Sequence, residues 1–315
     1  MKKISIVVPA FNEEACIPNL VESLNNVLSS LNYHFEIIIV DDGSSDNSFE
    51  TIKNLAVINP SLKGIKLSRN MGHQAALDCG LKHASGDAVI CMDSDLQHPP
   101  SLIPKMIELW ENGYDVVITQ KLESQEINWF YKLLAKKFYK WFNKYSHVKI
   151  TPQASDFRLM SRKSLNAVLK MPEYHRFYRG LVPFVGFKTA NLTFNVEKRF
   201  AGKRKYNLKQ SLDLASNGIF SFSDFALKIP VYLGIISIII IFLYFLVSLG
   251  LYFIFDIEFV KGWASIIAIL TISFSVQFIF MGIMGIYIGK IFVEIKRRPI
   301  FFVDETVGEI EISEI

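Results

Sequence analysis

The sequence predicts an α/β fold in which a mostly parallel sheet has helices on both faces, followed by a helical membrane hairpin. Apolar runs of strand length alternate with helix-periodic segments over residues 1 to about 125. Acidic clusters follow several of these runs, at the positions where ligands bind to parallel sheets. Half of the 315 residues are hydrophobic, and the excess lies in the last third of the chain, which predicts the membrane hairpin.

Strands and helices are expected in regular alternation. The predicted strands are 4–10, 35–42, 63–68, 87–93 and 115–120. The predicted helices between them are 16–31, 46–59 and 73–85. Because the strands are continuously apolar and do not alternate with polar residues, both faces of the sheet should be covered by helices.

The polar clusters FNEE, DDGSSD and DSDLQ all stand at the carboxyl ends of predicted strands. In a parallel sheet these ends meet at one edge, where ligands bind. Asp41 or Asp42 could accept a hydrogen bond from a base N–H or a ribose hydroxyl. The alternative for this cluster is a helix N-cap formed by Ser44, Ser45 or Asp46.

Two like charges, Asp93 and Asp95, end one predicted buried strand. They can stay ionised side by side if a divalent cation lies between them and an anionic substrate. Mg²⁺ and Mn²⁺ favour carboxylate oxygens and commonly bind one or two of them together with substrate phosphates. Asp93, Asp95 and Gln97 alternate along an extended chain and would share one face. The glycine-rich phosphate loops of dinucleotide and P-loop proteins do not occur in the sequence.

Net charge and cysteine content restrict the kinds of ligand and partner that the protein can bind. The net charge is only +4 and no basic run of the nucleic-acid-binding type occurs, so we expect no nucleic acid partner. The three cysteines, Cys16, Cys79 and Cys91, lack metal-ligand spacing and are expected to be small buried residues in a reducing compartment.

Two long apolar segments, 229–255 and 263–293, each exceed the ~20 residues needed to cross a bilayer. A turn of a few residues joins them, so a two-helix transmembrane hairpin is predicted over 229–293. Two buried core helices would be the alternative, but the segments are longer than globular domains usually contain. Cations gather outside the pair, at Lys228, Lys290, Lys296, Arg297 and Arg298. The positive-inside rule therefore places the large N-terminal domain and both termini in the cytoplasm, at an inner or plasma membrane, in a multi-pass protein.

Residues 129–145 and 205–228 are rich in aromatic residues, the first also in lysine. Amphipathic helices of this composition favour a membrane surface, and the alternative is packing against the sheet. The predicted divisions are a catalytic domain over 1–204, interfacial helices over 205–228, the hairpin, and a tail over 294–315.

Six motifs together resemble the inverting family 2 glycosyltransferases, which have the Rossmann-like GT-A fold. In order they are VPAFNEE, VDDGSSD, SRNMGHQAAL, ASGDAVICMDSDLQHPP, SDFRLMSR and RFAGKRKY. More narrowly, the sequence resembles polyprenyl-phosphate glycosyltransferases, among them dolichol-phosphate mannose synthase and bacterial undecaprenyl-phosphate glucosyltransferases. The resemblance covers the chain from about residue 4 to 299.

The resemblance implies transfer of a sugar from a nucleotide-sugar to a membrane polyprenyl phosphate, with Mg²⁺ or Mn²⁺ as cofactor. The implied carrier is UDP, with GDP as the alternative. Two positions depart from the family pattern, Lys121 where arginine is usual and Arg204 where serine or threonine is usual.

The resemblance also implies a role for each residue of this sequence that matches a motif position of the family. The implied donor-nucleotide residues are Pro9, Phe11, Glu13, Asp41, Asp42 and Asp93, and the implied metal and diphosphate residues are Asp93, Asp95 and Gln97. The implied acceptor and diphosphate residues are Ser155, Arg199 and Lys205, and the implied catalytic residues are Asp95, Asp156 and Arg158. His73 and His98 are expected to be structural hydrogen-bond partners.

Asp156 is predicted to position the acceptor or its cations and not to remove a proton. A phosphate monoester has a second pKa of about 6, so the attacking oxygen is already ionised at neutral pH.

Alternative functions are a processive polysaccharide synthase, which would carry a Q-x-x-R-W motif that is absent, and an inactive membrane scaffold. A homo-oligomer is expected.

Overall fold

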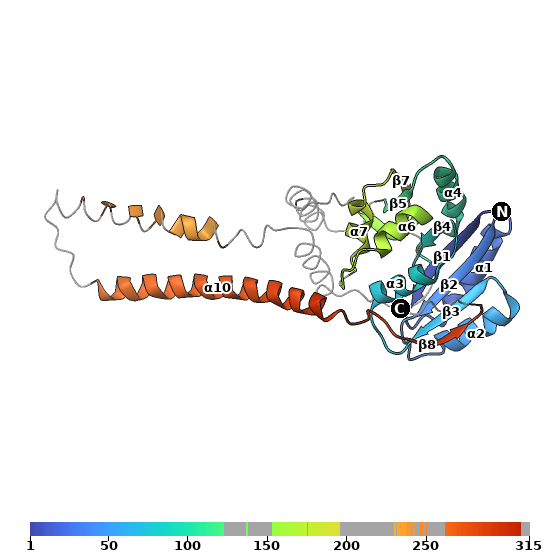
Figure 1. Cartoon of the computed structure of the whole chain (residues 1–315), viewed down its shortest axis with the longest axis horizontal. Helices are drawn as coiled ribbons and strands as arrows, with labels where there is room; N and C mark the ends of the chain where they lie inside the picture. The colour runs from blue at the N-terminus through green and yellow to red at the C-terminus, as the bar shows by residue number, and fades with distance from the viewer. Residues whose placement is uncertain are drawn as a thin grey trace. The chain divides into compact units, whose positions relative to one another are not determined.

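The computed structural model describes residues 1–122, 153–174, 176–195 and 262–309, with residue 137 and scattered positions between 230 and 250. Its described strands form one eight-stranded sheet in the order β7-β5-β6-β4-β1-β2-β3-β8 (Figure 1). The strands are β1 (Lys3–Ala10), β2 (His34–Asp41), β3 (Leu62–Leu67), β4 (Ala88–Cys91), β5 (Val116–Lys121), β6 (Ala154–Ser161), β7 (Thr189–Phe194) and β8 (Val303–Val307).

The helices of this part of the chain lie between the strands. They are α1 (Ile17–Leu28), α2 (Ser48–Ile58), α3 (His73–His83), α4 (Ile103–Glu111), α6 (Arg162–Leu169) and α7 (Tyr178–Phe184), with a 3₁₀ turn at Pro100–Leu102. The predicted alternation of strands and helices is confirmed up to β4, and α4, between β4 and β5, is a helix that was not predicted.

The central strands are parallel, as predicted. β1 pairs in parallel with β2 and β4, β2 with β3, and β5 with β7. β6 runs antiparallel between β4 and β5, and β8 runs antiparallel to β3. The sheet is therefore mixed, and the predicted class of a mostly parallel sheet with helices on both faces is confirmed.

Both faces of the sheet are covered. On one face Ile4, Ile6 and Val8 of β1 belong to the same buried cluster as α1 residues such as Leu20 and α4 residues such as Met106. On the other face α3 packs directly against β1 and β2, and a side chain at Gly80 would collide with Val7. The close approach of α3 brings its first residue, His73, to the sheet edge where β4 ends.

Strand β8 was not predicted, because residues 294–315 were expected to be a tail outside the catalytic domain. Ile65 pairs with Thr306 in the β3–β8 ladder. At Gly64 a side chain would collide with Ile52 of α2 and Val307 of β8. The short β8 segment, VDETV, is too acidic to stand out as a buried strand, and its partner is distant in sequence.

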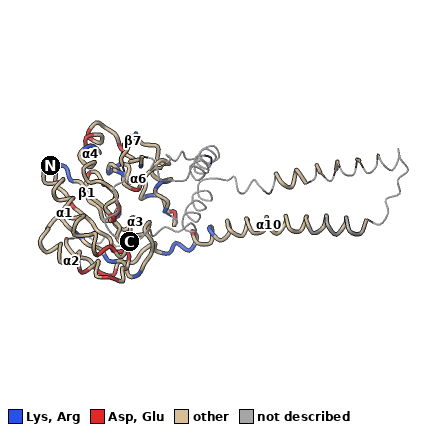
Figure 2. Tube along the Cα trace, turned by 180° about the vertical axis from the view of Figure 1, so that it is seen from behind, with Lys and Arg blue, Asp and Glu red and all other residues tan. Residues whose placement is uncertain are grey.

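Helix α10 (Trp263–Lys296) is one continuous helix of 34 residues, as predicted for the second apolar segment. Within it, Ile272–Lys296 is long and apolar enough to cross a membrane. Lys296 is the last residue of this helix, and Arg297 and Arg298 follow it, so cations gather at its C-terminal end (Figure 2). The first apolar segment, 229–255, and the predicted interfacial helices, 129–145 and 205–228, lie largely or wholly outside the described residues.

A buried carboxylate, Glu36, fastens the sheet at the end opposite the acidic clusters. Glu36 is 2% exposed. One of its oxygens accepts hydrogen bonds from Ser5 Oγ at 2.6 Å and from the Ser85 backbone N–H at 2.7 Å. The other pairs with Lys3 Nζ at 2.8 Å and Lys63 Nζ at 3.0 Å. Burial alone would raise the pKa of Glu36, but these bonds outweigh it and lower the pKa from 4.5 to about 2.

We expect Glu36→Gln to lower the free energy of unfolding by about 3 kcal/mol at pH 7, because it leaves two ammonium groups beside an uncharged amide. A carboxyl whose folded pKa is depressed stabilises the fold above its unfolded pKa and loses this effect as the pH falls toward the folded value. The difference in unfolding free energy between wild type and variant should therefore have its largest value above pH 4.5 and decrease as the pH approaches 2. Denaturant unfolding at several pH values measures this difference.

The matched control is Glu111→Gln, which breaks an exposed pair with Lys2 and should change the unfolding midpoint far less. A wild-type advantage over Glu36→Gln that stays constant down to pH 3 would contradict the prediction.

Candidate active site

The carboxyl ends of β1, β2 and β4 meet at one edge of the sheet and bring the predicted donor-side residues together. Ala10 pairs with Asp41, and the Asp42 backbone N–H donates to Ala10 O at 2.8 Å. The Glu13 backbone N–H donates to Ser48 Oγ at 3.0 Å. The loops after β1 and β2 are therefore fastened to each other directly beside the end of β4.

Asp41 and Asp42 are 0% and 3% exposed, and both side chains bind protein backbone. Asp41 accepts from the backbone N–H and the hydroxyl of Ser44. Asp42 accepts from the backbone N–H groups of Met71 at 2.7 Å and Gly72 at 3.0 Å. Burial raises the pKa of both carboxyls against these hydrogen bonds. Both side chains therefore shape the loops at this edge of the sheet, and Asp42 ties β2 to the start of α3.

Asp93 and Asp95 follow the end of β4, as predicted. Asp93 Oδ1 lies 3.0 Å from His73 Nε2, and its side chain is 33% exposed. Asp95 Oδ1 accepts from the Gln97 backbone N–H at 3.2 Å. Burial raises the pKa of Asp93, but the hydrogen bond and charge of His73 act against burial, and the pKa is lowered to about 2. At least one carboxylate at this edge is thus ionised and reachable from solvent.

These residues fit a divalent cation that is shared with a substrate. Among the described residues no group of three or more His, Cys, Asp and Glu side chains could hold a metal ion alone. Two carboxylates with a substrate diphosphate are, however, a usual donor set for Mg²⁺ or Mn²⁺. Asp93 and Asp95 provide such a pair, and the partly exposed Asp93 leaves room for ligands from outside the protein.

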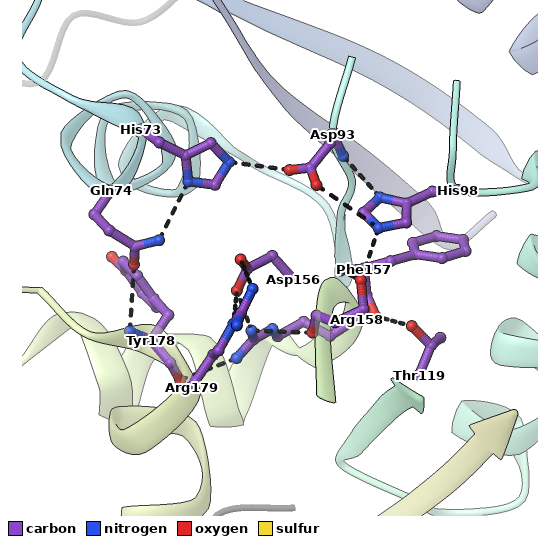
Figure 3. A network of polar contacts seen from close by, with 11 residues as sticks. His73, Gln74, Asp93, His98, Thr119, Asp156, Phe157, Arg158, Tyr178 and Arg179 are labelled. Atoms are coloured by element: carbon purple, nitrogen blue, oxygen red, sulfur yellow. Dashed lines mark hydrogen bonds and ion pairs between the residues drawn. The ribbon is translucent and has the colours of Figure 1, made fainter. Parts of the chain in front are cut away.

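The predicted acceptor-side residues lie on β6, which is antiparallel to β4 and pairs Cys91 with Arg158. Asp156 Oδ1 accepts from Arg158 at 2.6 Å, and Asp156 Oδ2 accepts from Arg179 at 2.8 Å (Figure 3). Arg158 is buried and also donates to the carbonyls of Ser155 and Tyr178. Asp156 and Arg158 are thus one ion-paired unit, joined by an arginine that sequence reasoning missed.

Arg179 stands in α7, and its side chain, 34% exposed, is the most accessible of this unit. The charges of Arg179 and Arg158 outweigh the burial of Asp156 and hold its pKa well below the usual range. Two cations around one carboxylate leave the unit with a net positive charge, which suits an anionic ligand. No sequence spacing links residue 179 to residue 156, because only the fold brings α7 against β6.

The segment that carries Arg179 is fixed to α3 by a second buried cluster. Tyr178 Oη donates to Asp78 Oδ1 at 2.5 Å, and the Tyr178 backbone N–H donates to Gln74 Oε1 at 3.4 Å. Arg176 Nε lies 3.5 Å from Asp78. Helix α3 therefore touches both halves of the site, through His73 at Asp93 and through Asp78 at α7.

His73 and His98 both contact Asp93, as Figure 3 shows. They were expected to be structural hydrogen-bond partners, and their partner proves to be the predicted metal-binding carboxylate. Arg199 and Lys205 lie outside the described residues. Of the other predicted donor residues, Pro9 is buried in β1, and Phe11 and Glu13 are half-buried in the following loop.

Comparison with known proteins gives consistent matches. Residues 5–169 match the family Glycosyl transferase family 2. An uncharacterized glycosyltransferase of Synechocystis sp. is 38% identical, over 97% of this chain and 96% of that protein. The SfII prophage-derived bactoprenol glucosyl transferase of Shigella flexneri is 37% identical, over 96% of this chain and 98% of that protein.

Among solved structures, glucosyl-3-phosphoglycerate synthase from Mycobacterium tuberculosis, in complex with Mn²⁺, uridine-diphosphate and phosphoglyceric acid, matches with a TM-score of 0.47. It is 19% identical over 70% of this chain and 76% of that chain. This degree of similarity assigns no role to any residue of the site.

Proposed function

This chain belongs to glycosyl transferase family 2, and on that premise we propose that it transfers a sugar from a nucleotide-sugar to a membrane polyprenyl phosphate. The observation that carries the proposal is the similarity, over nearly the full length of both chains, to proteins named bactoprenol glucosyl transferase. Glucose is accordingly the first sugar to test, and UDP the first carrier.

In the proposed reaction an oxygen of the lipid phosphate attacks the anomeric carbon of the sugar. The bond from that carbon to the nucleoside diphosphate breaks, and its electron pair leaves with the diphosphate. Asp93 and Asp95 would hold a divalent ion, which supplies charge stabilisation for the departing diphosphate. The loops held by Asp41 and Asp42 would enclose the nucleotide, and the predicted contacts of Pro9, Phe11, Glu13 and Gln97 belong to the same half.

On the acceptor side, Arg158 and Arg179 would attract the lipid phosphate, and Asp156 would hold both guanidinium groups in place. A carboxylate this strongly paired is a poor base, which supports a positioning role for Asp156. The attacking phosphate oxygen needs no base, because it is ionised above a pKa of about 6. Arg199 and Lys205 are proposed to contribute further positive charge around the diphosphate.

We also propose a two-helix membrane hairpin with the catalytic domain and both termini in the cytoplasm. The apolar helix α10 and the cations at its C-terminal end support this topology. Membrane anchoring would confine the enzyme and its lipid acceptor to one surface and so raise their effective concentration. Separately, we propose that the protein forms a homo-oligomer.

The decisive experiment incubates the detergent-solubilised full chain with undecaprenyl phosphate and UDP-glucose in the presence of Mn²⁺ or Mg²⁺. We expect a glucolipid and UDP in equal amounts, and no product when the metal is chelated. Parallel reactions with UDP-N-acetylglucosamine and GDP-mannose test the sugar and the carrier. Binding of each nucleotide-sugar without any glycolipid would overturn the proposal and favour an inactive scaffold, whereas long sugar chains would favour a synthase.

A further inference from the structure

His98 lies where the two halves of the site meet. It stands five residues after Asp93, and its side chain is fully buried. Its Nδ1 lies 3.0 Å from the backbone nitrogen of Asp93, and its Nε2 lies 2.7 Å from Ser155 Oγ on β6. One ring therefore contacts both the loop after β4 and the strand that carries Asp156.

The hydrogen bonds determine which nitrogen of this ring carries the proton. A backbone N–H can only donate, so Nδ1 of His98 must accept from Asp93 and cannot carry a hydrogen. The hydrogen of the neutral ring then lies on Nε2 and is donated to Ser155 Oγ. His98 Nε2 also lies 3.7 Å from Asp93 Oδ2.

Aromatic packing holds the plane of the His98 ring. Phe157 stacks on His98 with ring centroids 5.2 Å apart, and Phe194 of β7 meets it edge-on at 5.8 Å. The ring is thus held between the loop after β4 and strand β6, with Nδ1 as acceptor and Nε2–H as donor.

We propose that His98 is a positioning residue that fixes the metal-binding loop 93–98 and the acceptor strand β6 at one separation. This proposal rests on the proposed glycosyl transfer and assigns His98 a role within it. Its Nδ1 holds the loop that presents Asp93 and Asp95 to the metal and diphosphate. Its Nε2–H holds Ser155, the neighbour of Asp156, and so sets where the acceptor phosphate lies relative to the sugar.

Two conservative substitutions separate these contacts. In His98→Asn the amide oxygen can take the place of Nδ1 and accept from Asp93, but the donor to Ser155 is lost. In His98→Gln the amide nitrogen can take the place of Nε2 and donate to Ser155, but the acceptor for Asp93 is lost. Loss of one buried hydrogen bond changes an equilibrium by about tenfold.

We expect His98→Gln to weaken Mn²⁺-dependent UDP binding about tenfold, measured by titration calorimetry on the full chain, with the KM for undecaprenyl phosphate nearly unchanged. The amide of Asp93 should also exchange its hydrogen faster. We expect His98→Asn to bind Mn²⁺ and UDP like wild type and to raise the acceptor KM or lower kcat about tenfold. Adding Ser155→Ala to His98→Asn should cause little further loss, because both remove the same hydrogen bond.

Equal effects of the two variants on nucleotide binding and on acceptor kinetics would overturn the proposal and leave His98 a core residue. The calorimetric and exchange measurements need no acceptor. They therefore still test the Nδ1 contact if undecaprenyl phosphate proves not to be the acceptor, which would be a failure of the proposed function alone. A thermal melt of each variant without metal or nucleotide separates general unfolding from the specific effects.

Discussion

Asp95→Asn should lower kcat by at least about a thousandfold, the loss expected when a metal that stabilises several kcal/mol of developing charge is no longer held. The substituted amide keeps an oxygen for the Gln97 backbone N–H, so the local turn should survive. Initial rates of glycolipid formation, measured over a range of Mn²⁺ concentrations, check the result. The variant should also lose the ability of Mn²⁺ to strengthen UDP binding.

The matched control is Asp87→Asn at the opposite end of β4. Asp87 Oδ2 accepts from the Lys3 backbone N–H at 2.8 Å, and an amide oxygen can take over this bond. The control should therefore keep wild-type kcat and metal dependence. Full activity of Asp95→Asn, or activity that persists in excess chelator, would show that no metal is shared between this loop and the diphosphate.

Asp156→Asn should lower kcat about a hundredfold without changing the shape of the pH–rate profile. The guanidinium groups of Arg158 and Arg179 hold the pKa of Asp156 well below its usual range. The carboxylate is then ionised at every pH from 5 to 9, and its titration cannot produce a rising limb there. The loss comes from two arginines that no longer have a common anchor. Rates for wild type and variant across this pH range check the prediction.

Asp156→Asn leaves the buried guanidinium of Arg158 without its carboxylate, which destabilises the fold by about 3–5 kcal/mol. Arg179→Lys is therefore used as a second variant that keeps the Asp156 carboxylate. Lysine keeps the charge and the Arg158–Asp156 pair but cannot reproduce the bidentate contact. We expect a fall in kcat/KM for the lipid of about tenfold with little change in melting temperature. A rising limb present in wild type and absent from Asp156→Asn would show that Asp156 is a base after all.

The sheet was predictable up to β5 because its strands are largely apolar and are separated by helices of the right length. Strands β6, β7 and β8 were not predicted. β7 alternates exposed and half-buried residues, and β8 is short and acidic. Their places in the sheet depend on pairing with strands far away in the sequence, which local patterns do not encode.

Within the site, the carboxylates of the DSD motif were predictable because two like charges at the end of a buried strand require a counterion. The partners of those carboxylates were not. His73 begins a helix, His98 precedes two prolines and Arg179 lies in a short helix, and nothing in these neighbourhoods indicates an aspartate as partner. The resemblance to a family identified the motif residues, whereas the contacts between motifs required the three-dimensional arrangement.

Strand β8 has a consequence for the order in which the molecule is made. The ribosome releases β3 early and β8 only after all of α10, so the backbone groups of β3 at this edge have no ladder partner while the helix is being synthesised. An unpaired edge is prone to join other strands. Completion of the catalytic sheet is thereby postponed until the apolar helix has left the ribosome, and a nascent chain stalled within that helix would carry an unfinished enzyme.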